Sequence, residues 1–221
     1  MSHDIGVDTG GTFTDVVARD ERGRLSVHKL LSTPDDPSRA IADGAQAVAL
    51  RPARGLVHGT TVATNALLER KGARVAFVTT AGFEDLLALR RQNRPELYAL
   101  APRLPQPLVA RADCIGVAER VTHQGAVLLE LTDAEVARVV DHVRATSPEA
   151  VAICLLHCYA NPEHEARLAA ALRAAFPDLH ITASHELVRE FREYERASTA
   201  AVNAFVGPVM SRYLRALIER L

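Results

Sequence analysis

The first 31 residues contain three short segments in which apolar and polar residues largely alternate. These segments, residues 4–9, 12–19 and 25–31, are predicted to be strands, and Gly23 lies in the turn between the last two. The pattern then changes to a helical period, because Ile41, Ala45 and Val48 recur at i, i+4 and i+7. We therefore expect a three-stranded opening followed by a helix.

Polar and proline residues mark where several helices should begin. Asp36 and Pro37 have the residue types of a helix N-cap and first helical position. Thr132 and Glu135 have the spacing of a capping box. A terminal helical region is expected from about residue 190, with a kink at Gly207-Pro208.

From residue 55 onward, short apolar runs alternate with amphipathic segments. Strands are predicted at 55–58, 73–79, 150–157 and 180–184, and helices at 61–71, 82–91, from 132, at 162–175 and from 190. Residues 92–112 contain four prolines and are predicted to be irregular. Two short strands are expected around residues 123–125. Antiparallel-type strands followed by alternating helices and parallel-type strands indicate an α/β fold.

Composition narrows the class of protein. Apolar residues make up 48% of the chain, which is ample for a packed core, and the net charge of −1 gives no reason to expect nucleic acid or an anionic membrane as a partner. No apolar run approaches the roughly 20 residues that span a bilayer. Met1–Asp4 carries no apolar signal segment, and three cysteines without framework spacing suit reduced thiols, so a cytoplasmic location is predicted. Cys154 and Cys158 are interpreted as buried strand thiols rather than metal ligands.

The segment from Asp8 to Asp15, Asp-Thr-Gly-Gly-Thr-Phe-Thr-Asp, is the strongest candidate site. Glycines at 10 and 11 can adopt backbone angles closed to other residues and let a ligand approach the main chain. Successive N–H groups in such a turn form a concave anion site. Two aspartates would repel a bare phosphate, so they indicate a bridging divalent cation, Mg²⁺. The alternative is a plain β-hairpin with a Gly-Gly turn.

The segment is neither of the common nucleotide loops. The chain contains no G-x-x-x-x-G-K-[ST], and the Gly-Gly pair is not followed by G-x-G-x-x-G. A phosphate-binding hairpin at the start of a chain resembles the first phosphate motif of the actin, Hsp70 and sugar-kinase superfamily. Within that superfamily, Val-Asp-Thr-Gly-Gly-Thr-Phe-Thr-Asp resembles the hydantoinase A and 5-oxoprolinase family.

Two further blocks support this resemblance in the expected order. His58-Gly59-Thr60-Thr61-Val62-Ala63-Thr64-Asn65-Ala66 is similar to the family's His-Gly-Thr-Thr-x-x-Thr-Asn-Ala segment. The third block runs from Glu193 to Ala204 and is followed by Gly207-Pro208. The resemblance implies a ribonuclease-H-like, actin-type lobe with a mixed sheet flanked by helices.

The resemblance also implies the chemistry. In the family, ATP phosphorylates an amide or lactam oxygen and water then opens the ring, or a carbonyl substrate is carboxylated. Carried onto this chain, Gly10, Gly11, Thr12 and Thr14 are expected to contact the phosphates of ATP. Asp8 is expected to hold Mg²⁺, with Asp15 as a further catalytic carboxylate near the metal's water.

The second and third blocks supply expected substrate or cleft residues. His58, Gly59, Thr60 and Thr61 lie where a predicted strand runs into a helix, a usual position for ligands. The alternative is that Thr60 caps the helix and His58 packs in the strand, and Asn65 either fixes the loop or binds ligand. The resemblance makes Glu195 and Arg196 candidates for a ligand cleft. The alternative is that they lie on a solvated face of a helix. Three arginines beside the irregular segment, Arg90, Arg91 and Arg94, are either anion-recognising or a solvated basic edge.

Family members of the A type are several hundred residues longer, which shapes the expected organisation. Residues 1–189 are predicted to form one lobe with an insertion at about 92–130, and residues 190–221 to begin a second lobe that is missing. The apolar row Val209, Tyr213, Leu217 and Leu221 is expected to seek a partner.

The expected partners are the second lobe, a B-type subunit, a small cyclic amide and a second copy of the chain. An inactive nucleotide-binding or interaction domain and an ATP-dependent carboxylase subunit remain alternatives.

Overall fold

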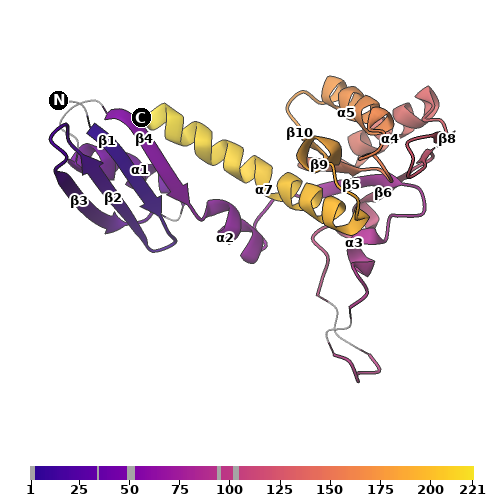
Figure 1. The fold of residues 1–221 in the computed structure, drawn as a ribbon, viewed down its shortest axis with the longest axis horizontal. Coiled ribbons are helices and arrows are strands. Elements are labelled where there is room, and N and C mark those ends of the chain that lie inside the picture. The colour runs from indigo at the N-terminus through magenta and orange to yellow at the C-terminus, as the bar shows by residue number, and fades with distance from the viewer. Residues whose placement is uncertain (1–2, 34, 49–52, 94–95, 102–104) are drawn as a thin grey trace. The chain divides into compact units, whose positions relative to one another are not determined.

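The computed structural model describes residues 3–33, 35–48, 53–93, 96–101 and 105–221. The chain forms two compact units (Figure 1). The first comprises residues 1–72 and 209–221, and the second comprises residues 73–208. The predicted boundary near residue 190 therefore does not coincide with the boundaries of these units, and the assignment of 1–189 to one lobe stays a prediction.

The first unit is a four-stranded mixed sheet with helices. Its elements are β1 (His3–Thr9), β2 (Phe13–Arg19), β3 (Leu25–Leu31), α1 (Pro37–Val48), β4 (Ala53–Thr60) and α2 (Val62–Leu68). The strand order is β3-β2-β1-β4, with β1 antiparallel to β2 and parallel to β4. The three predicted opening strands are confirmed. The helix begins at Pro37 as expected, and the carboxylate of Asp36 accepts a hydrogen bond from the N–H of Ser38 at 3.2 Å.

One face of this sheet carries the core of the first unit. Ile5, Val7, Val16 and Ile41 are buried there together with Tyr213 and Leu217 of α7 (Glu193–Arg220). The expectation that the terminal apolar row is left open is therefore wrong for Tyr213 and Leu217, because the sheet of the same chain already covers them. A row of side chains on a helix cannot reveal whether its partner lies in the same chain.

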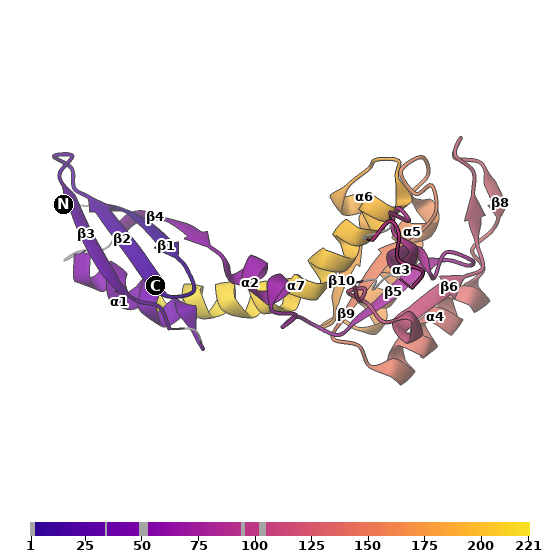
Figure 2. The ribbon, with the colours of Figure 1, turned by 90° about the horizontal axis from the view of Figure 1, so that it is seen from below.

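The second unit is a four-stranded parallel sheet in the order β10-β9-β5-β6 (Figure 2). Its strands and a separate small hairpin are β5 (Val75–Thr80), β6 (Cys114–Val117), β7 (Arg120–Val121), β8 (Val127–Leu129), β9 (Ala150–Cys154) and β10 (His180–Ala183). Every residue of β5 and β9 is buried, as expected for central strands of a parallel sheet covered on both faces. The α/β class is confirmed, but only β4 of the predicted parallel-type strands extends the first sheet, whereas β5, β6, β9 and β10 form this second sheet.

Helices cover both faces of the parallel sheet. The helical elements of the second unit are α3 (Leu86–Leu89), the 3₁₀ turn η1 (Arg111–Asp113), α4 (Asp133–Thr146), α5 (Glu163–Ala175), α6 (Ser184–Leu187) and the first part of α7. On one face of β10, Ala183 belongs to the core that lies under α4 and α5. On the other face, the hydroxyl of Thr182 donates to Asn203 of α7 at 2.8 Å. Gly207 permits close packing, because a Cβ there would lie 2.2 Å from the ring of His180.

Three local expectations need correction. The helix predicted at 82–91 is only four residues long: it begins at Leu86, after turns that include Gly82 with a φ of 89°, and it ends at Leu89 because Arg90 adopts a φ of 55°. Part of the predicted insertion at 92–130 is integral to the fold, since β6 is a strand of the central sheet. Thr132 caps α4 by accepting from the N–H of Glu135 at 3.2 Å, but the Glu135 carboxylate accepts from Ala118 and Arg138 instead of returning to Thr132.

The two thiols interpreted as buried strand residues are both buried, but only Cys154 lies on β9, which ends there, and Cys158 lies in the turn that follows. Cys154 and Cys158 are each 2% exposed, and burial raises the pKa of Cys154 to about 11. Within the described parts of the chain, no helix is long and apolar enough to cross a bilayer.

Candidate functional site

Hydrogen bonds from Ser32 fix the turn between β1 and β2. The hydroxyl of Ser32 donates to the carbonyl of Gly10 at 2.9 Å and lies 2.9 Å from the hydroxyl of Thr14, while its N–H donates to the carbonyl of Thr12 at 2.9 Å. Ser32 was not among the predicted site residues, because its only signal in the sequence is its position just after the third strand. A turn fixed by three bonds from one residue is preorganised for a ligand.

The glycines of the turn do not have the backbone geometry expected of them. Neither Gly10 nor Gly11 has a positive φ, unlike Gly23, Gly82 and Gly125. The N–H of Gly10 donates to the carbonyl of Phe13 at 3.0 Å. Among the described residues, no hydrogen bond uses the N–H of Gly11 or Thr12. Gly10 and Gly11 therefore contribute by leaving main-chain N–H groups of the turn accessible to a ligand.

Thr14 does not face the turn's open side. Its side chain is 0% exposed, and its hydroxyl contacts Ser32 in the interior. Thr12, by contrast, is exposed at the turn. Thr14 is thus a packing residue of the hairpin in this structure, because alternation along β2 turns its side chain toward the core.

Asp8 and Asp15 lie opposite each other on the outward face of the sheet. The Asp15 carboxylate is engaged by Lys29, whose Nζ lies 2.8 and 3.0 Å from the two carboxylate oxygens. Asp8 is exposed and lies beside Gly59 in the β1–β4 ladder. A Cβ at Gly59 would come within 3.1 Å of the Asp8 carboxylate. Gly59 of the second block therefore gives room to the aspartate of the first block.

His58 contacts protein groups on both ring nitrogens. Nδ1 lies 3.3 Å from the carbonyl oxygen of Val7, and Nε2 hydrogen-bonds to the hydroxyl of Tyr213. Burial lowers the pKa of His58, so the ring is neutral at pH 7. These contacts favour the packing alternative for His58.

The threonines that follow differ in role. The hydroxyl of Thr60 accepts from the N–H of Val62 at 3.2 Å, as in a helix-capping turn. Thr61 is exposed, and its hydroxyl donates to the carbonyl of Thr9 at 3.4 Å and accepts from the amide of Asn65 at 3.2 Å. Thr60 thus supports the helix start, whereas Thr61 faces the ligand-accessible side.

A cavity of about 720 Å³ joins the first and second blocks. We call it the turn cavity. Its lining includes Thr9, Gly10 and Gly11 of the hairpin and Thr61 and Asn65 of the second block, whereas His58, Gly59 and Thr60 are not part of it. The buried hydroxyl of Thr9 has no hydrogen-bond partner among the described residues. The volume falls in the range of small-molecule sites.

The turn cavity also contains cations that the sequence did not indicate. Lys71 and Arg212 line it, and Lys71 pairs with Glu69 at 2.8 Å. Arg212 comes from α7, 147 residues beyond Asn65 of the second block and 197 beyond Asp15 of the first, so no local pattern could have placed it there. Asp8 and Asp15 lie on the opposite face of the sheet, because alternation along β1 separates Asp8 from Thr9.

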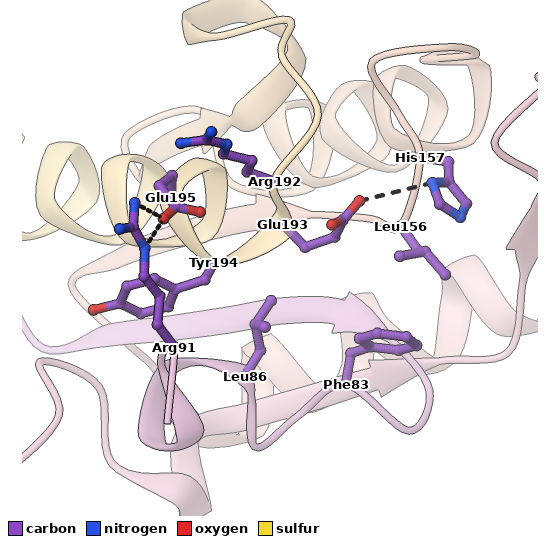
Figure 3. Close-up of a pocket in the computed structure, with 9 residues that line it drawn as sticks. All are labelled: Phe83, Leu86, Arg91, Leu156, His157, Arg192, Glu193, Tyr194 and Glu195. Carbon is purple, nitrogen blue, oxygen red and sulfur yellow. Dashed lines mark hydrogen bonds and ion pairs between the residues drawn. The ribbon is translucent and has the colours of Figure 1, made fainter. Parts of the chain in front are cut away.

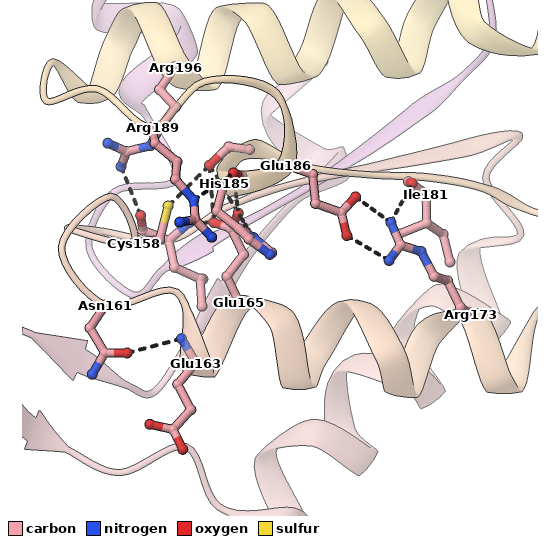
Figure 4. Close-up of polar contacts among 12 residues, drawn as sticks. Cys158, Asn161, Glu163, Glu165, Arg173, Ile181, His185, Glu186, Arg189 and Arg196 are labelled. Atoms are coloured by element: carbon pink, nitrogen blue, oxygen red, sulfur yellow. Dashed lines mark hydrogen bonds and ion pairs between the residues drawn. The ribbon is translucent and has the colours of Figure 1, made fainter.

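The third block lies in the second unit and contributes differently than expected. Arg196 is 1% exposed and donates to the carbonyls of Leu155 and Glu190, both at 2.9 Å. Near it, the buried Glu165 carboxylate accepts from the N–H of Leu155 at 2.7 Å and from the N–H and Nδ1 of His185 at 2.8 and 2.9 Å (Figure 4). Arg196 is therefore a buried structural cation and does not face a cleft.

Glu195 and the predicted arginines are surface groups. Glu195 is partly exposed and pairs with Arg91, while Arg90 donates to the carbonyl of Pro105 at 2.9 Å. Arg94 lies outside the described residues. The solvated-edge alternative thus fits Arg90, whereas Arg91 and Glu195 line a pocket of the second unit.

Comparison with known proteins gives the family. Residues 4–176 match the hydantoinase/oxoprolinase N-terminal region. The chain is 36% identical over 232 residues to caprolactamase subunit alpha of Pseudomonas jessenii, covering 98% of this chain and 33% of that protein. It is 30% identical over 259 residues to 5-oxoprolinase of Saccharomyces cerevisiae, covering 96% of this chain and 20% of that protein.

Solved structures agree. ATP-dependent caprolactamase from Pseudomonas jessenii matches with a TM-score of 0.85 at 36% identity, and nucleotide-free acetone carboxylase with 0.84 at 25% identity. Each match covers 98% of this chain and 34% of the other. The chain thus spans about a third of the length of the caprolactamase subunit. The resemblance inferred from the three motif blocks is confirmed, and the chain belongs to the hydantoinase/oxoprolinase family, whose N-terminal region it carries.

Proposed function

We propose that this chain is the ATP-binding N-terminal portion of a cytoplasmic, ATP-dependent cyclic-amide hydrolase of the hydantoinase or 5-oxoprolinase type, built on a ribonuclease-H-like, actin-type lobe. The observation that carries the proposal is the meeting of two motif blocks. Asp8 and Gly59 are neighbours in the β1–β4 ladder, and the hairpin turn shares a cavity with Thr61 and Asn65. The name of the caprolactamase relative supports a lactam as the substrate class.

The residues present suit a nucleotide with its metal. The open N–H groups of Gly11 and Thr12 suit phosphate oxygens, and the unsatisfied hydroxyl of Thr9 leaves a polar group to be met. Asp8 would hold Mg²⁺ through water on the outward face beside the hairpin turn, because its carboxylate is exposed and pairs with no cation among the described residues. Bound ATP supplies the phosphoryl group that activates the amide oxygen. The protein's part is positioning and charge neutralisation.

Two other functions remain as alternatives. A role as an ATP-dependent carboxylase subunit is favoured by the similarity to acetone carboxylase, and its substrate would be a ketone. A non-catalytic nucleotide-binding or interaction domain would have the same hairpin but would not hydrolyse ATP. Stimulation of ATP hydrolysis by lactams, by ketones with bicarbonate, or by neither separates the three.

We expect Thr61→Val to weaken catalysis in the intact enzyme by roughly tenfold, because this near-isosteric change removes one hydroxyl from the wall of the turn cavity. Steady-state kinetics with ATP and the lactam measure the effect. Thr64→Val, on the exposed side of the same helix, is the matched control. Kinetics of Thr61→Val equal to those of the parent would leave Thr61 only a structural role, through its contacts with Thr9 and Asn65.

The proposed function is tested by phosphate release. Phosphoryl transfer requires stabilising groups on all sides of the transferring phosphate, and this chain spans a third of the length of the caprolactamase subunit. We expect no lactam-stimulated ATP hydrolysis from residues 1–221 alone, and recovery when the remaining lobe and a B-type subunit are added. Robust turnover by the chain alone would overturn the half-site proposal. Absence of turnover in the full assembly with every lactam tested would overturn the hydrolase assignment.

A further inference from the structure

A second cavity lies wholly within the second unit, at the carboxyl ends of parallel strands. It has a volume of about 720 Å³ and is bounded by the segment after β5, the turn after β9 and the first turn of α7 (Figure 3). We call it the sheet-end pocket. In open parallel sheets, ligands bind outside the carboxyl ends of the strands. The proposed nucleotide site in the first unit uses none of the residues that line this pocket.

The lining combines an apolar floor with two charged ends. Phe83, Leu86 and Leu156 form the floor. Glu193 lies at one end and points toward His157, with 3.7 Å between Oε1 and Nδ1 (Figure 3). At the other end, Arg91 pairs with Glu195. An apolar body can therefore lie between two polar ends.

The two ends carry opposite net charge. Burial lowers the pKa of His157, so at pH 7 the ring is neutral and leaves the negative charge of Glu193 uncompensated among the lining residues. The other end holds Arg91, Arg192 and Glu195, which sum to one positive charge. Arg120 does not line the pocket, and stacks on the Phe83 ring at 5.3 Å.

Backbone strain is concentrated around the pocket. His157 and Arg192, which line it, have φ angles of 59° and 83°, and Arg90 and Gln92, which flank Arg91, have 55° and 57°. Four of the six non-glycine residues with positive φ in the described chain thus lie in or beside this pocket. Such clustering is characteristic of functional sites, where packing holds residues in uncommon conformations. The Nδ1 atom of His157 is also buried without a hydrogen-bond partner in the described chain.

We propose that the sheet-end pocket binds a short zwitterionic amino acid whose ammonium and carboxylate groups are separated by an apolar chain. The ammonium group pairs with Glu193, the carboxylate with Arg192 and Arg91, and the methylene chain lies on Phe83, Leu86 and Leu156. Hydrolysis of a lactam ring, with addition of one water across the amide bond, yields a compound of this class. The identification of the ligand as the ring-opened product rests on the proposed function, whereas its binding does not.

The test is a calorimetric or NMR titration of residues 1–221 with 4-aminobutanoate, 5-aminopentanoate and 6-aminohexanoate. Hexanoate, hexylamine and ε-caprolactam serve as probes that lack one or both charges. We expect saturable binding of at least one amino acid, and at least roughly tenfold weaker binding of the three comparison probes, because each leaves a charged end of the pocket unpaired. Equal or tighter binding of ε-caprolactam would overturn the proposal, as would binding of none of the amino acids.

Variants locate the binding. Glu193→Gln and Arg192→Gln each remove one charge from a partly or fully exposed side chain and should weaken amino-acid binding roughly tenfold. Glu219→Gln, exposed on the same helix and outside the pocket, is the control and should bind like the parent. Unchanged binding in both pocket variants would place the ligand elsewhere. Phosphate release by the full assembly tests the proposed function separately. If the sheet-end pocket binds no amino acid, lactam-stimulated ATP hydrolysis is still expected.

Discussion

Asp8→Ala is expected to abolish Mg²⁺-dependent ATP binding by the intact enzyme while leaving the fold unchanged. The carboxylate is exposed on the outward face of β1, so its removal leaves no cavity in the core and breaks no ion pair among the described residues. Loss of a metal-holding carboxylate should cost on the order of 100-fold in affinity for Mg-ATP. A titration with Mg-ATP and circular dichroism of the same sample measure both parts of the result.

Asp4→Ala is the matched control for Asp8→Ala. Asp4 lies on the same strand and the same face, and its partner is Arg19 at 3.0 Å. Since this is a surface pair, the variant should lose less than about 1 kcal/mol of stability and bind Mg-ATP like the parent. If Asp8→Ala also binds Mg-ATP like the parent, the hairpin is not the metal site and the plain-hairpin alternative is preferred.

Glu165→Ala is expected to destabilise the second unit by about 3–5 kcal/mol, because it leaves buried groups without partners. The Glu165 carboxylate is 0% exposed and accepts hydrogen bonds from Leu155, Ser184 and His185. Its charge also stabilises the buried guanidinium of Arg196. The change should lower the melting temperature of the second unit by roughly 10–15 °C.

Glu163→Ala is the matched control for Glu165→Ala. It removes an exposed glutamate from the same first turn of α5 and so reports the effect of losing a charge at that helix end. This variant should melt within about 2 °C of the parent, since surface substitutions are usually within ±0.5 kcal/mol. Thermal unfolding followed by circular dichroism compares the two variants. A Glu165→Ala protein as stable as Glu163→Ala would show that the buried network contributes no net stability.

Local elements could be predicted from sequence because their signals are carried by neighbouring residues. The three opening strands, the start of α1 at Pro37 and the cap at Thr132 are all present. Prediction failed where a distant contact or an uncommon backbone angle decided the outcome. Arg90 ends α3 early, and Glu135 finds Ala118 instead of the N-cap residue it was expected to bond.

For the site, motif chemistry gave candidates but not their orientations. Both Thr14 and Thr61 carry a hydroxyl within a motif, yet Thr14 faces the core and Thr61 lines the turn cavity. Arg196 is also a motif residue, and it is buried as a structural cation. Which face of an element is covered depends on packing, because the period of two in a strand defines two faces without saying which of them faces solvent.

The sequence by itself determined the family, the α/β class and the residues of the Asp8–Asp15 and His58–Asn65 blocks, because each is encoded in consecutive positions. Only the tertiary structure decided that β5, β6, β9 and β10 form a second sheet, that Tyr213 and Leu217 pack on the first sheet, and that Ser32 and Arg212 join the turn. It also decided that Glu193, Arg91 and Leu156 line one pocket. These features depend on contacts between residues far apart in the chain, whose formation is governed by the burial of complementary surfaces and not by any local period.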